Sequence, residues 1–202
     1  MPPRILQLRR PQLILRHRPS SLPLIQHRLL LNLDAEGPPR HCTASRRLPF
    51  AAMPLYEIIV DIDSYKEFLT GCSQSAVTRW TEPDAHGRRW PDEAILTLGF
   101  RSISETFTSK LKCCPGVLIE TVAGPGEQET GSRALISSLR TRWTLQPTSR
   151  GPNVETEVRV DIDYRMRHIA SDFLIASYVP QVLEAVVKLF ERRAYEKLRE
   201  TS

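Results

Sequence analysis

The sequence lacks the short motifs that identify many enzymes and metal sites. No HExxH, GxSxG, P-loop or GxGxxG pattern occurs in its 202 residues. The four cysteines form no CxxC pair, so we expect neither a disulfide framework nor a metal site. No apolar run approaches the ~18 residues that a membrane-spanning helix needs. Histidine is scarce beyond residue 47, where only His86, in a turn cluster, and His168, at a strand exit, remain. These absences disfavour motif-defined catalysis.

What the chain does contain is typical of a soluble globular domain. Apolar residues make up 41% of it and charged residues 25%, which excludes collagen-like, coiled-coil and wholly disordered classes. The length suits one domain with a tail.

The positive charge is confined to the N-terminal segment. Residues 1–47 hold nine arginines, no lysine and two acids, whereas the rest of the chain holds 19 basic and 21 acidic residues. An arginine-rich, acid-poor segment is typical of a mitochondrial transit peptide, which we favour over a disordered basic arm for RNA or anionic lipid. We predict this leader over residues 1–42, with removal near residues 40–45, and a folded domain over residues 43–202. Because that domain is nearly neutral, no nucleic-acid partner is expected.

The domain opens with one strand and two short helices. A strand is predicted over residues 43–49 and a helix over residues 53–62. Ser64 is expected to cap a second short helix that ends at Phe68, and Gly71 to stop it.

After residue 71 the apolar period changes from helical to alternating. The clearest alternation runs from Val154 to Met166, where apolar residues and one threonine occupy the even positions and charged residues the odd ones. Alternation this long indicates a strand with one buried and one solvated face. We predict strands over residues 75–81, 94–100, 103–113, 117–123, 135–145 and 154–166.

A long amphipathic helix closes the chain. Apolar residues recur at steps of three and four from Phe173 to Leu198, and Pro180 should either start the regular helix or kink it. Strands in series followed by a helix indicate an α+β protein. We therefore predict a curved antiparallel sheet wrapped around the long C-terminal helix.

This order resembles the helix-grip (START-like) fold of lipid-transfer START domains and polyketide cyclases. Within that superfamily, residues 48–194 are similar to the mitochondrial coenzyme Q-binding proteins. The matching segments are Leu48–Phe50, Asp61–Leu69 (DIDSYKEFL), Gly99–Phe100, Glu105–Ser109 (ETFTS), Trp143 with Pro147, Val160–Tyr164 (VDIDY) and Phe190–Ala194 (FERRA). The chain departs from that pattern at Thr70 and Gly71, where the family usually has Pro-Trp before the cysteine.

The resemblance implies a carrier that is not an enzyme. Family members bind ubiquinone (coenzyme Q) or its polyprenylated precursors on the matrix side of the mitochondrial inner membrane, and support respiratory electron transport and quinone biosynthesis. The implied partners are ubiquinone as bound ligand, the inner membrane by peripheral contact, and proteins of quinone biosynthesis or the respiratory chain. No other cofactor is implied.

A polyprenyl quinone needs a long apolar site, because its tail is bound by burial at about 25 cal/mol per Å². The candidate lining residues face inward in the predicted fold. They are Phe100, Phe107, Leu111, Leu139, Trp143, Val158, Val160, Ile162 and Tyr164 from the sheet, and Leu183, Val187 and Phe190 from the helix. The alternative is that these side chains fill a solid core.

Glu105 is the most informative single residue, because it lies in phase with apolar positions and should be buried. One reading is a polar contact for the quinone head, a task that the polar tips of Tyr164 and Trp143 also suit. The other is a structural pair, with Arg101, Arg133 or Arg140 as candidate partners.

An opening toward lipid is expected where residues 53–68 and 166–172 flank one end of the site. Leu55, Ile58 and Ile59 are the candidate lipid contacts, although core packing explains them equally well.

Two other functions stay open. The first is a cyclase or hydratase that uses the same site, with Glu105 as its acid–base group. The second is an interaction protein, since bacterial relatives of this subfamily are linked to ribosome association; that role favours a basic domain surface.

Overall fold

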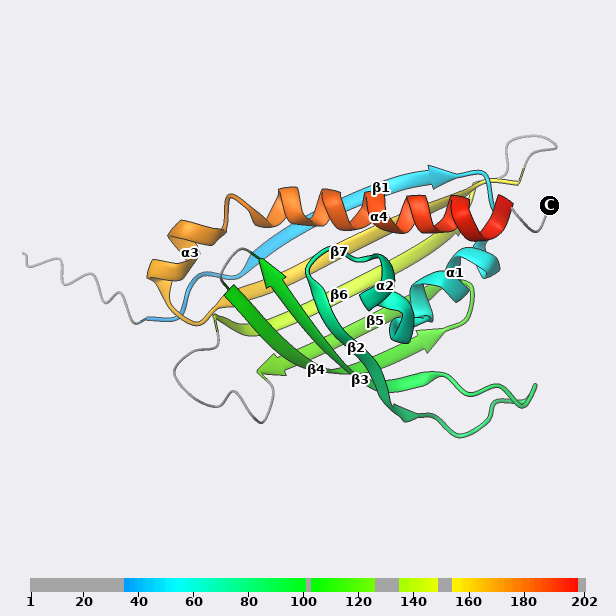
Figure 1. Cartoon of the computed structure of the whole chain (residues 1–202), viewed down its shortest axis with the longest axis horizontal. Coiled ribbons are helices and arrows are strands. Elements are labelled where there is room, and N and C mark those ends of the chain that lie inside the picture. The colour runs from blue at the N-terminus through cyan, green and yellow to red at the C-terminus, as the bar shows by residue number, and fades with distance from the viewer. Residues whose placement is uncertain (1–34, 101–102, 126–134, 149–153, 200–202) are drawn as a thin grey trace, which may run out of the picture. The chain divides into compact units, whose positions relative to one another are not determined.

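The computed structural model describes residues 35–100, 103–125, 135–148 and 154–199. Seven antiparallel strands form one sheet in the order β1-β7-β6-β5-β4-β3-β2 (Figure 1). The strands are β1 (Arg40–Leu48), β2 (Cys72–Trp80), β3 (Pro91–Phe100), β4 (Ile103–Cys114), β5 (Leu118–Pro125), β6 (Ile136–Pro147) and β7 (Thr156–Met166). The helices are α1 (Ala52–Val60), the 3-10 turn η1 (Ile62–Ser64), α2 (Tyr65–Phe68), α3 (Ile169–Ile175) and α4 (Val179–Arg199).

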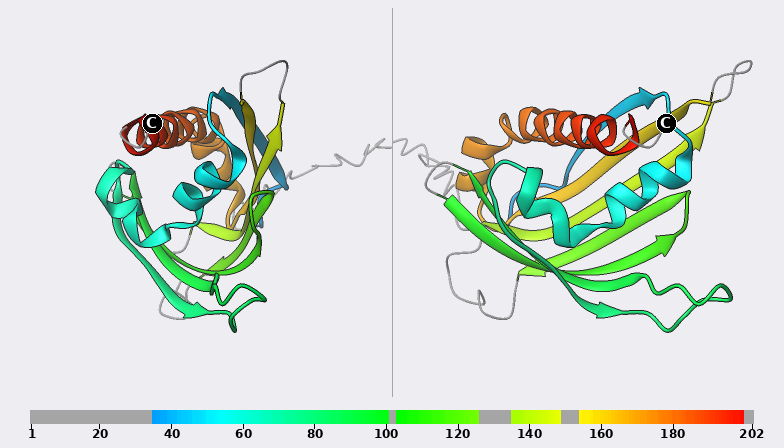
Figure 2. Two further views of the ribbon diagram at one scale, coloured as in Figure 1. Left: turned by 90° about the vertical axis from the view of Figure 1, so that its right-hand side faces the viewer. Right: turned by 45° about the vertical axis from the view of Figure 1, so that its right-hand side comes forward.

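The predicted fold class is confirmed. The sheet curls around the helices, and α4, α1 and α2 lie on its concave side (Figure 2). The alternation in β7 has the expected result: Val158, Val160 and Tyr164 are buried on the concave face, while Arg159 and Asp163 are exposed on the convex face.

β1 begins at Arg40, so the boundary that we drew between residues 42 and 43 falls inside this strand. Arg40 pairs with Tyr164 of β7. The preceding residues also bond to the domain, since the Gly37 amide donates to the Met166 carbonyl at 2.9 Å and the Ile169 amide to the Ala35 carbonyl at 2.8 Å. Residues 35–42 are therefore part of the folded unit.

The helix after α1 is not capped as predicted. The Ser64 side chain makes no capping bond to α2, and its hydroxyl donates instead to the Asp61 carbonyl at 2.9 Å. Ser64 already has helical φ and ψ as the last residue of η1, whereas a capping serine needs an extended backbone. Gly71 follows with φ +86°, and a Cβ there would lie 2.4 Å from the Gly99 carbonyl oxygen. This position therefore requires glycine.

Pro180 starts the regular helix, which is one of its two predicted effects. It is the second residue of α4, where an amide has no partner within the helix. The axes of α3 and α4 differ by 56°. Among the described residues, no single helix has the length and apolar content to cross a membrane; α3 and α4 reach that level only when taken together across their bend.

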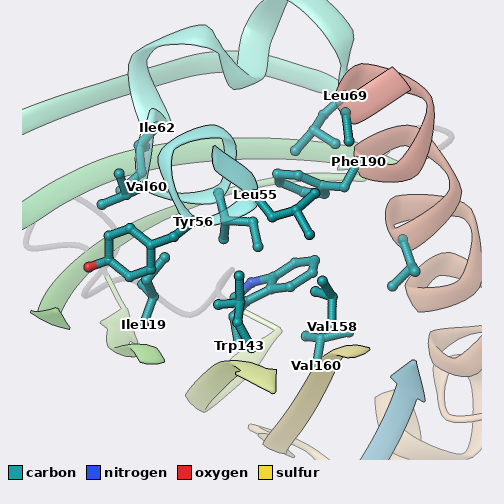
Figure 3. Packing of buried hydrophobic residues seen from close by; sticks show 14 of the residues in the cluster. Leu55, Tyr56, Val60, Ile62, Leu69, Ile119, Trp143, Val158, Val160 and Phe190 are labelled. Atoms are coloured by element: carbon teal, nitrogen blue, oxygen red, sulfur yellow. The ribbon is translucent and has the colours of Figure 1, made fainter. Parts of the chain in front are cut away.

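The hydrophobic core lies at the α1 end of the concave face (Figure 3). α1 packs against α4, β5 and β6, and Phe190 of α4 is the centre of an aromatic group. Its ring centroid is 5.1 Å from those of Tyr65 and Phe68 and 4.8 Å from that of Trp143. Aromatic packing of this kind fixes α4 to the sheet and to α2.

Candidate ligand-binding site

The predicted lining residues lie between the sheet and α4, as the alternation required. Ten candidate residues, Glu105 included, are buried: Glu105, Phe107, Leu111, Trp143, Val158, Val160, Tyr164, Leu183, Val187 and Phe190. Leu139 and Ile162 are half-buried. The side chain of Phe100 lies outside the described residues.

These residues form two groups rather than one. The first group, which we name the packed half, belongs to the continuous core: Leu111, Trp143, Val158, Val160, Leu183, Val187 and Phe190. A crevice beside Trp143 and Phe190, bordered by Leu55 and Arg46, has a volume of about 20 Å³. Such a space holds about one water molecule. For the packed half, the geometry favours the alternative of a solid core.

The second group, which we name the α3 half, lies where the sheet meets α3. Its members are Glu105, Phe107, Leu139, Tyr164, Met166 and Asp172. Phe107, Tyr164 and Met166 are buried, but they are not part of the continuous core. Two carboxylates, Glu105 and Asp172, are buried among them, with 7% and 1% exposure.

Between the two halves, small side chains face inward from the central strands. We name Ser109, Thr121, Ala123 and Thr141 the mid-sheet patch. The strand register places them in adjacent positions: Ser109 pairs with Ala123, and Thr121 with Thr141. Ser109, Thr121 and Thr141 are only half-buried although they are on the concave face, so solvent reaches this face between the two halves.

The mid-sheet patch was not predicted from the sequence. The signal that could have found it is a change of side-chain size along one face. Trp143 and Ile119, which pair in the register, occupy the packed end of β6 and β5, and only small residues occupy the next inward positions. A site for a ligand needs such a break in packing.

Glu105 makes a contact that supports the sheet. Its Oε1 accepts a hydrogen bond from the Ile136 amide at 3.0 Å. β5 ends at Pro125, which pairs with Phe107, while β4 and β6 extend further. Beyond the end of β5, the Glu105 carboxylate accepts the hydrogen bond that a backbone carbonyl of β5 would otherwise accept. This contact supports the structural alternative for Glu105.

Of the partners considered for Glu105, only Arg140 is described. It lies on the convex face, with its Nε 3.7 Å from Glu120 Oε1. Arg101 and Arg133 lie outside the described residues.

Asp172 fixes α3 to the edge of the sheet. Its Oδ1 and Oδ2 accept hydrogen bonds from Arg40 Nε at 3.1 Å and Nη2 at 2.5 Å. The bond to Asp172 raises the pKa of Arg40, so the guanidinium stays charged. Burial raises the pKa of the neighbouring Tyr164, which therefore presents a neutral hydroxyl at the α3 half.

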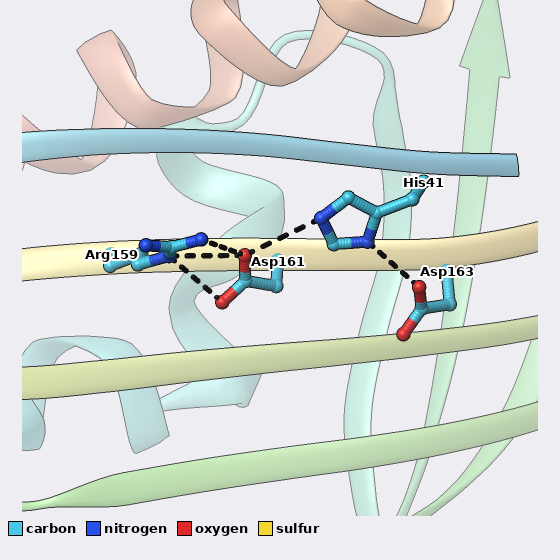
Figure 4. Close-up of polar contacts among 4 residues, drawn as sticks. All are labelled: His41, Arg159, Asp161 and Asp163. Atoms are coloured by element: carbon cyan, nitrogen blue, oxygen red, sulfur yellow. Dashed lines mark hydrogen bonds and ion pairs between the residues drawn. The ribbon is translucent and has the colours of Figure 1, made fainter.

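The convex face is ionic. His41 Nδ1 is 2.8 Å from Asp163 Oδ1, and Arg159 Nη2 is 3.1 Å from Asp161 Oδ1 (Figure 4). Burial acts to raise the pKa of Asp161, but hydrogen bonds from Arg159 and Thr43 outweigh it and lower the pKa.

A hollow of about 680 Å³ lies beside these residues. Its border includes Glu36, His41, Arg140, Asp163 and Arg165, together with Leu139 and Tyr164. Charged walls of this kind do not suit a hydrocarbon tail. Within the described ranges, no group of three or more His, Cys, Asp or Glu side chains is placed to hold a metal.

For the apolar residues of the first helix, the structure supports core packing, one of the two alternatives left open, over lipid contact. Leu55 and Ile59 are 2% and 4% exposed and belong to the core, and Ile58 is packed against it. The apolar face of α1 is directed into the curved sheet, and periodicity alone cannot separate a face that packs against protein from one that contacts lipid.

Comparison with known proteins identifies the family. The model described as polyketide cyclase / dehydrase and lipid transport matches residues 48–194, well over half of the chain. A coenzyme Q-binding protein of Schizosaccharomyces pombe, described as mitochondrial, is 29% identical over 147 residues, which cover 72% of this chain and 83% of that protein. The ribosome association toxin RatA of Rickettsia prowazekii is 27% identical over 156 residues, which cover 75% of this chain and 94% of the toxin.

A solved structure shares the fold. A START superfamily protein from Mycobacterium smegmatis superposes with a TM-score of 0.60 at 16% identity, over 77% of this chain and 97% of that one. The predicted resemblance to helix-grip and coenzyme Q-binding proteins is thus confirmed. The chain belongs to the polyketide cyclase / dehydrase and lipid transport family.

Proposed function

We propose that this protein is a non-enzymatic carrier of coenzyme Q or its polyprenylated precursors in mitochondria. One observation supports it most: the packing on the concave face is interrupted at the mid-sheet patch, beside buried apolar side chains, in a chain similar to coenzyme Q-binding proteins. A carrier needs an apolar site with few polar groups and no reacting groups.

The ligand is proposed to lie over the mid-sheet patch, with its tail along Phe107, Leu139 and Ile162. These are the predicted lining residues outside the tightest packing. The quinone head is directed toward Tyr164, whose neutral hydroxyl donates a hydrogen bond to a quinone carbonyl. Glu105 supports this end of the sheet through Ile136.

The site of action is proposed to be the matrix side of the inner membrane, where the carrier supports respiratory electron transport and quinone biosynthesis. The arginine-rich leader supports a mitochondrial address. A leader that ends before residue 35 leaves β1 and its bonds to β7 intact, whereas a cut at residues 40–45 removes part of β1. We therefore move the proposed cleavage to a point before residue 35.

The enzyme alternative has weaker support because the contact seen at its candidate acid–base group is a structural one. The Glu105 carboxylate accepts a hydrogen bond from the Ile136 amide. Two of the described histidines lie away from the concave face: His41 is on the convex face and His86 is in the exposed β2–β3 connection. The third, His168, is at the start of α3 with its Nδ1 buried. A general base must reach the proton that it removes.

Ribosome association remains a second candidate, favoured by the similarity to RatA. Among the described residues of β1 and β7, basic and acidic side chains alternate and pair on the convex face, as Arg159 does with Asp161. An RNA-binding surface is instead dominated by basic side chains.

The carrier proposal is tested by organic extraction of the purified full chain, followed by mass spectrometry of the extract. Wild type is expected to yield a polyprenyl quinone. Thr141→Phe fills the mid-sheet patch and should lower the quinone content about tenfold or more. Thr144→Phe is the matched control, because Thr144 is on the opposite face of the same strand.

Two results would contradict this proposal. One is wild-type protein free of quinone that sediments with ribosomes. The other is an equal quinone content in the Thr141 and Thr144 variants, provided that both keep the wild-type circular dichroism spectrum.

A further inference from the structure

The two most exposed of the large apolar side chains in the described residues lie side by side on α3, and two further exposed apolar side chains follow them in the sequence. Phe173 and Leu174 of α3 are 73% and 72% exposed, and Tyr178 and Val182 beside the start of α4 are 40% and 41% exposed. We name these four residues the α3 patch. α3 lies at the end of the domain away from α1 (Figure 1). Exposed apolar groups gathered in this way mark an interaction surface.

The α3 patch is also without exposed charge. Between Arg167 and Glu184 the sequence has one acidic or basic side chain other than His168, namely Asp172. That carboxylate is 1% exposed and bonded to Arg40. Since Asp172 is turned inward, α3 presents only apolar and neutral side chains outward.

Basic side chains border the patch. Arg167 lies two residues before α3 and Arg165 two residues earlier, where it pairs with Glu36 at 2.8 Å. Arg40, whose side chain is 41% exposed, pairs with Asp172 and holds α3 from the sheet edge. Apolar side chains at the tip of a structure with arginines behind them are the arrangement that inserts into an anionic lipid surface. A protein partner would need a larger contact, since stable interfaces bury ~800 Å² on each side.

The position of α3 connects this surface to the proposed cargo. α3 follows β7 directly and packs against it. Through Asp172 and Arg40 it borders the α3 half, where Tyr164 and Met166 are buried. A ligand that leaves the mid-sheet patch past α3 would leave the domain beside the exposed side chains of Phe173 and Leu174.

We propose that α3 and the first turn of α4 dock on an anionic bilayer surface, with Phe173 and Leu174 inserted below the headgroups. The inference rests on the proposed carrier function for its purpose, because docking there brings the cargo site to the lipid. Docking itself does not depend on the cargo and is measured without it.

The test is flotation of the full chain with phosphatidylcholine vesicles that contain cardiolipin. The variant is Phe173→Ser with Leu174→Ser, and it should weaken vesicle binding about 100-fold, since two large apolar side chains no longer enter the bilayer. The measurement is made at about 0.15 M salt and repeated at about 0.5 M, where binding by the arginine-rich leader is screened and insertion of the apolar side chains remains. The matched control is Val117→Ser with Val154→Ser, two side chains that are 57% and 55% exposed outside the α3 patch; it should bind as wild type does.

Quinone content separates failure of docking from failure of the carrier function. The Phe173/Leu174 variant should retain the wild-type quinone content and melting temperature. Equal flotation of this variant and wild type would overturn the docking proposal, as would wild type that does not float. A wild-type dimer that the variant converts to a monomer, without any vesicle binding, would assign the α3 patch to a second copy of the chain instead.

Discussion

The two halves of the concave face use apolar side chains in opposite ways. In the packed half, the rings of Phe190 and Trp143 lie 4.8 Å apart inside the core, and charged groups remain outside. At the α3 end, Asp172 and Glu105 are buried, whereas Phe173 and Leu174 face solvent. The hydrophobic effect alone does not produce that second arrangement. The packed half therefore serves stability, and the α3 end is where we expect function.

The largest effect should come from truncating the centre of the packed half. Phe190→Ala removes a ring that contacts Tyr65, Phe68 and Trp143, and should lower the free energy of unfolding by about 3–5 kcal/mol. Urea denaturation followed by circular dichroism measures the loss.

Phe107→Ala is the comparison from the α3 end. Phe107 is buried outside the continuous core, so its loss should be smaller and should be accompanied by a lower quinone content. If both truncations lower the free energy of unfolding equally, the two halves form one core and do not differ in function.

The elements of the fold could be predicted because each has a strong local pattern. β7 follows from thirteen residues of alternation, and α4 from apolar residues at helical spacing. The burial of Glu105 could also be predicted, because phase along a strand gives the face directly. The hydrogen-bond partner of Glu105 could not be predicted, because Ile136 is 31 residues away and the contact depends on where β5 ends.

The division of the site could not be predicted for a similar reason. Ser109, Thr121 and Thr141 belong to three strands, and only the register shows that they are neighbours. The sequence also leaves open whether the apolar face of the first helix contacts lipid or packs in the core, because α1 and α3 are both short and apolar. Tertiary packing decides which of them is buried, and it buries Leu55 while Phe173 stays exposed.

Glu105 gives a smaller effect that tests the α3 half. Glu105→Ala leaves the half-buried Ile136 amide without this acceptor and should cost about 1–3 kcal/mol of unfolding free energy. Glu105→Gln keeps an acceptor oxygen and should recover most of that loss. Thermal melts of the two variants measure the difference.

Quinone extraction from the same two variants then sorts the two roles of Glu105. A structural role leaves the quinone content of the glutamine variant at the wild-type level. A glutamine variant that is as stable as wild type but has lost its quinone would instead assign the carboxylate charge to the ligand.

The smallest effect on stability at neutral pH is expected from the buried tyrosines, and it should become measurable at alkaline pH. Tyr56 belongs to the continuous core and Tyr65 packs against it. Burial is the main cause that raises the pKa of both, well above the unfolded value of about 10. Below pH 10 both phenols are protonated in both states, so their contribution to stability is fully present. Above pH 10 the unfolded chain releases protons that the native state retains, and stability falls by about 1.4 kcal/mol per pH unit for each group.

At pH 8, Tyr56→Phe should therefore have the same free energy of unfolding in urea as wild type. At pH 11 its free energy of unfolding should be higher than that of wild type. The buried Tyr56 hydroxyl has no hydrogen-bond partner of good geometry among the described residues, and its contact with the Cys113 thiol is weak, so its removal should cost little at pH 8. Tyr164→Phe is the matched change at the α3 half, where burial raises the pKa but the charge of Arg40 opposes the rise. Its gain at pH 11 should be smaller than that of Tyr56→Phe. An equal gain would mean that Tyr164 is as isolated from water and charge as Tyr56, and that the α3 half is sealed rather than open to a ligand.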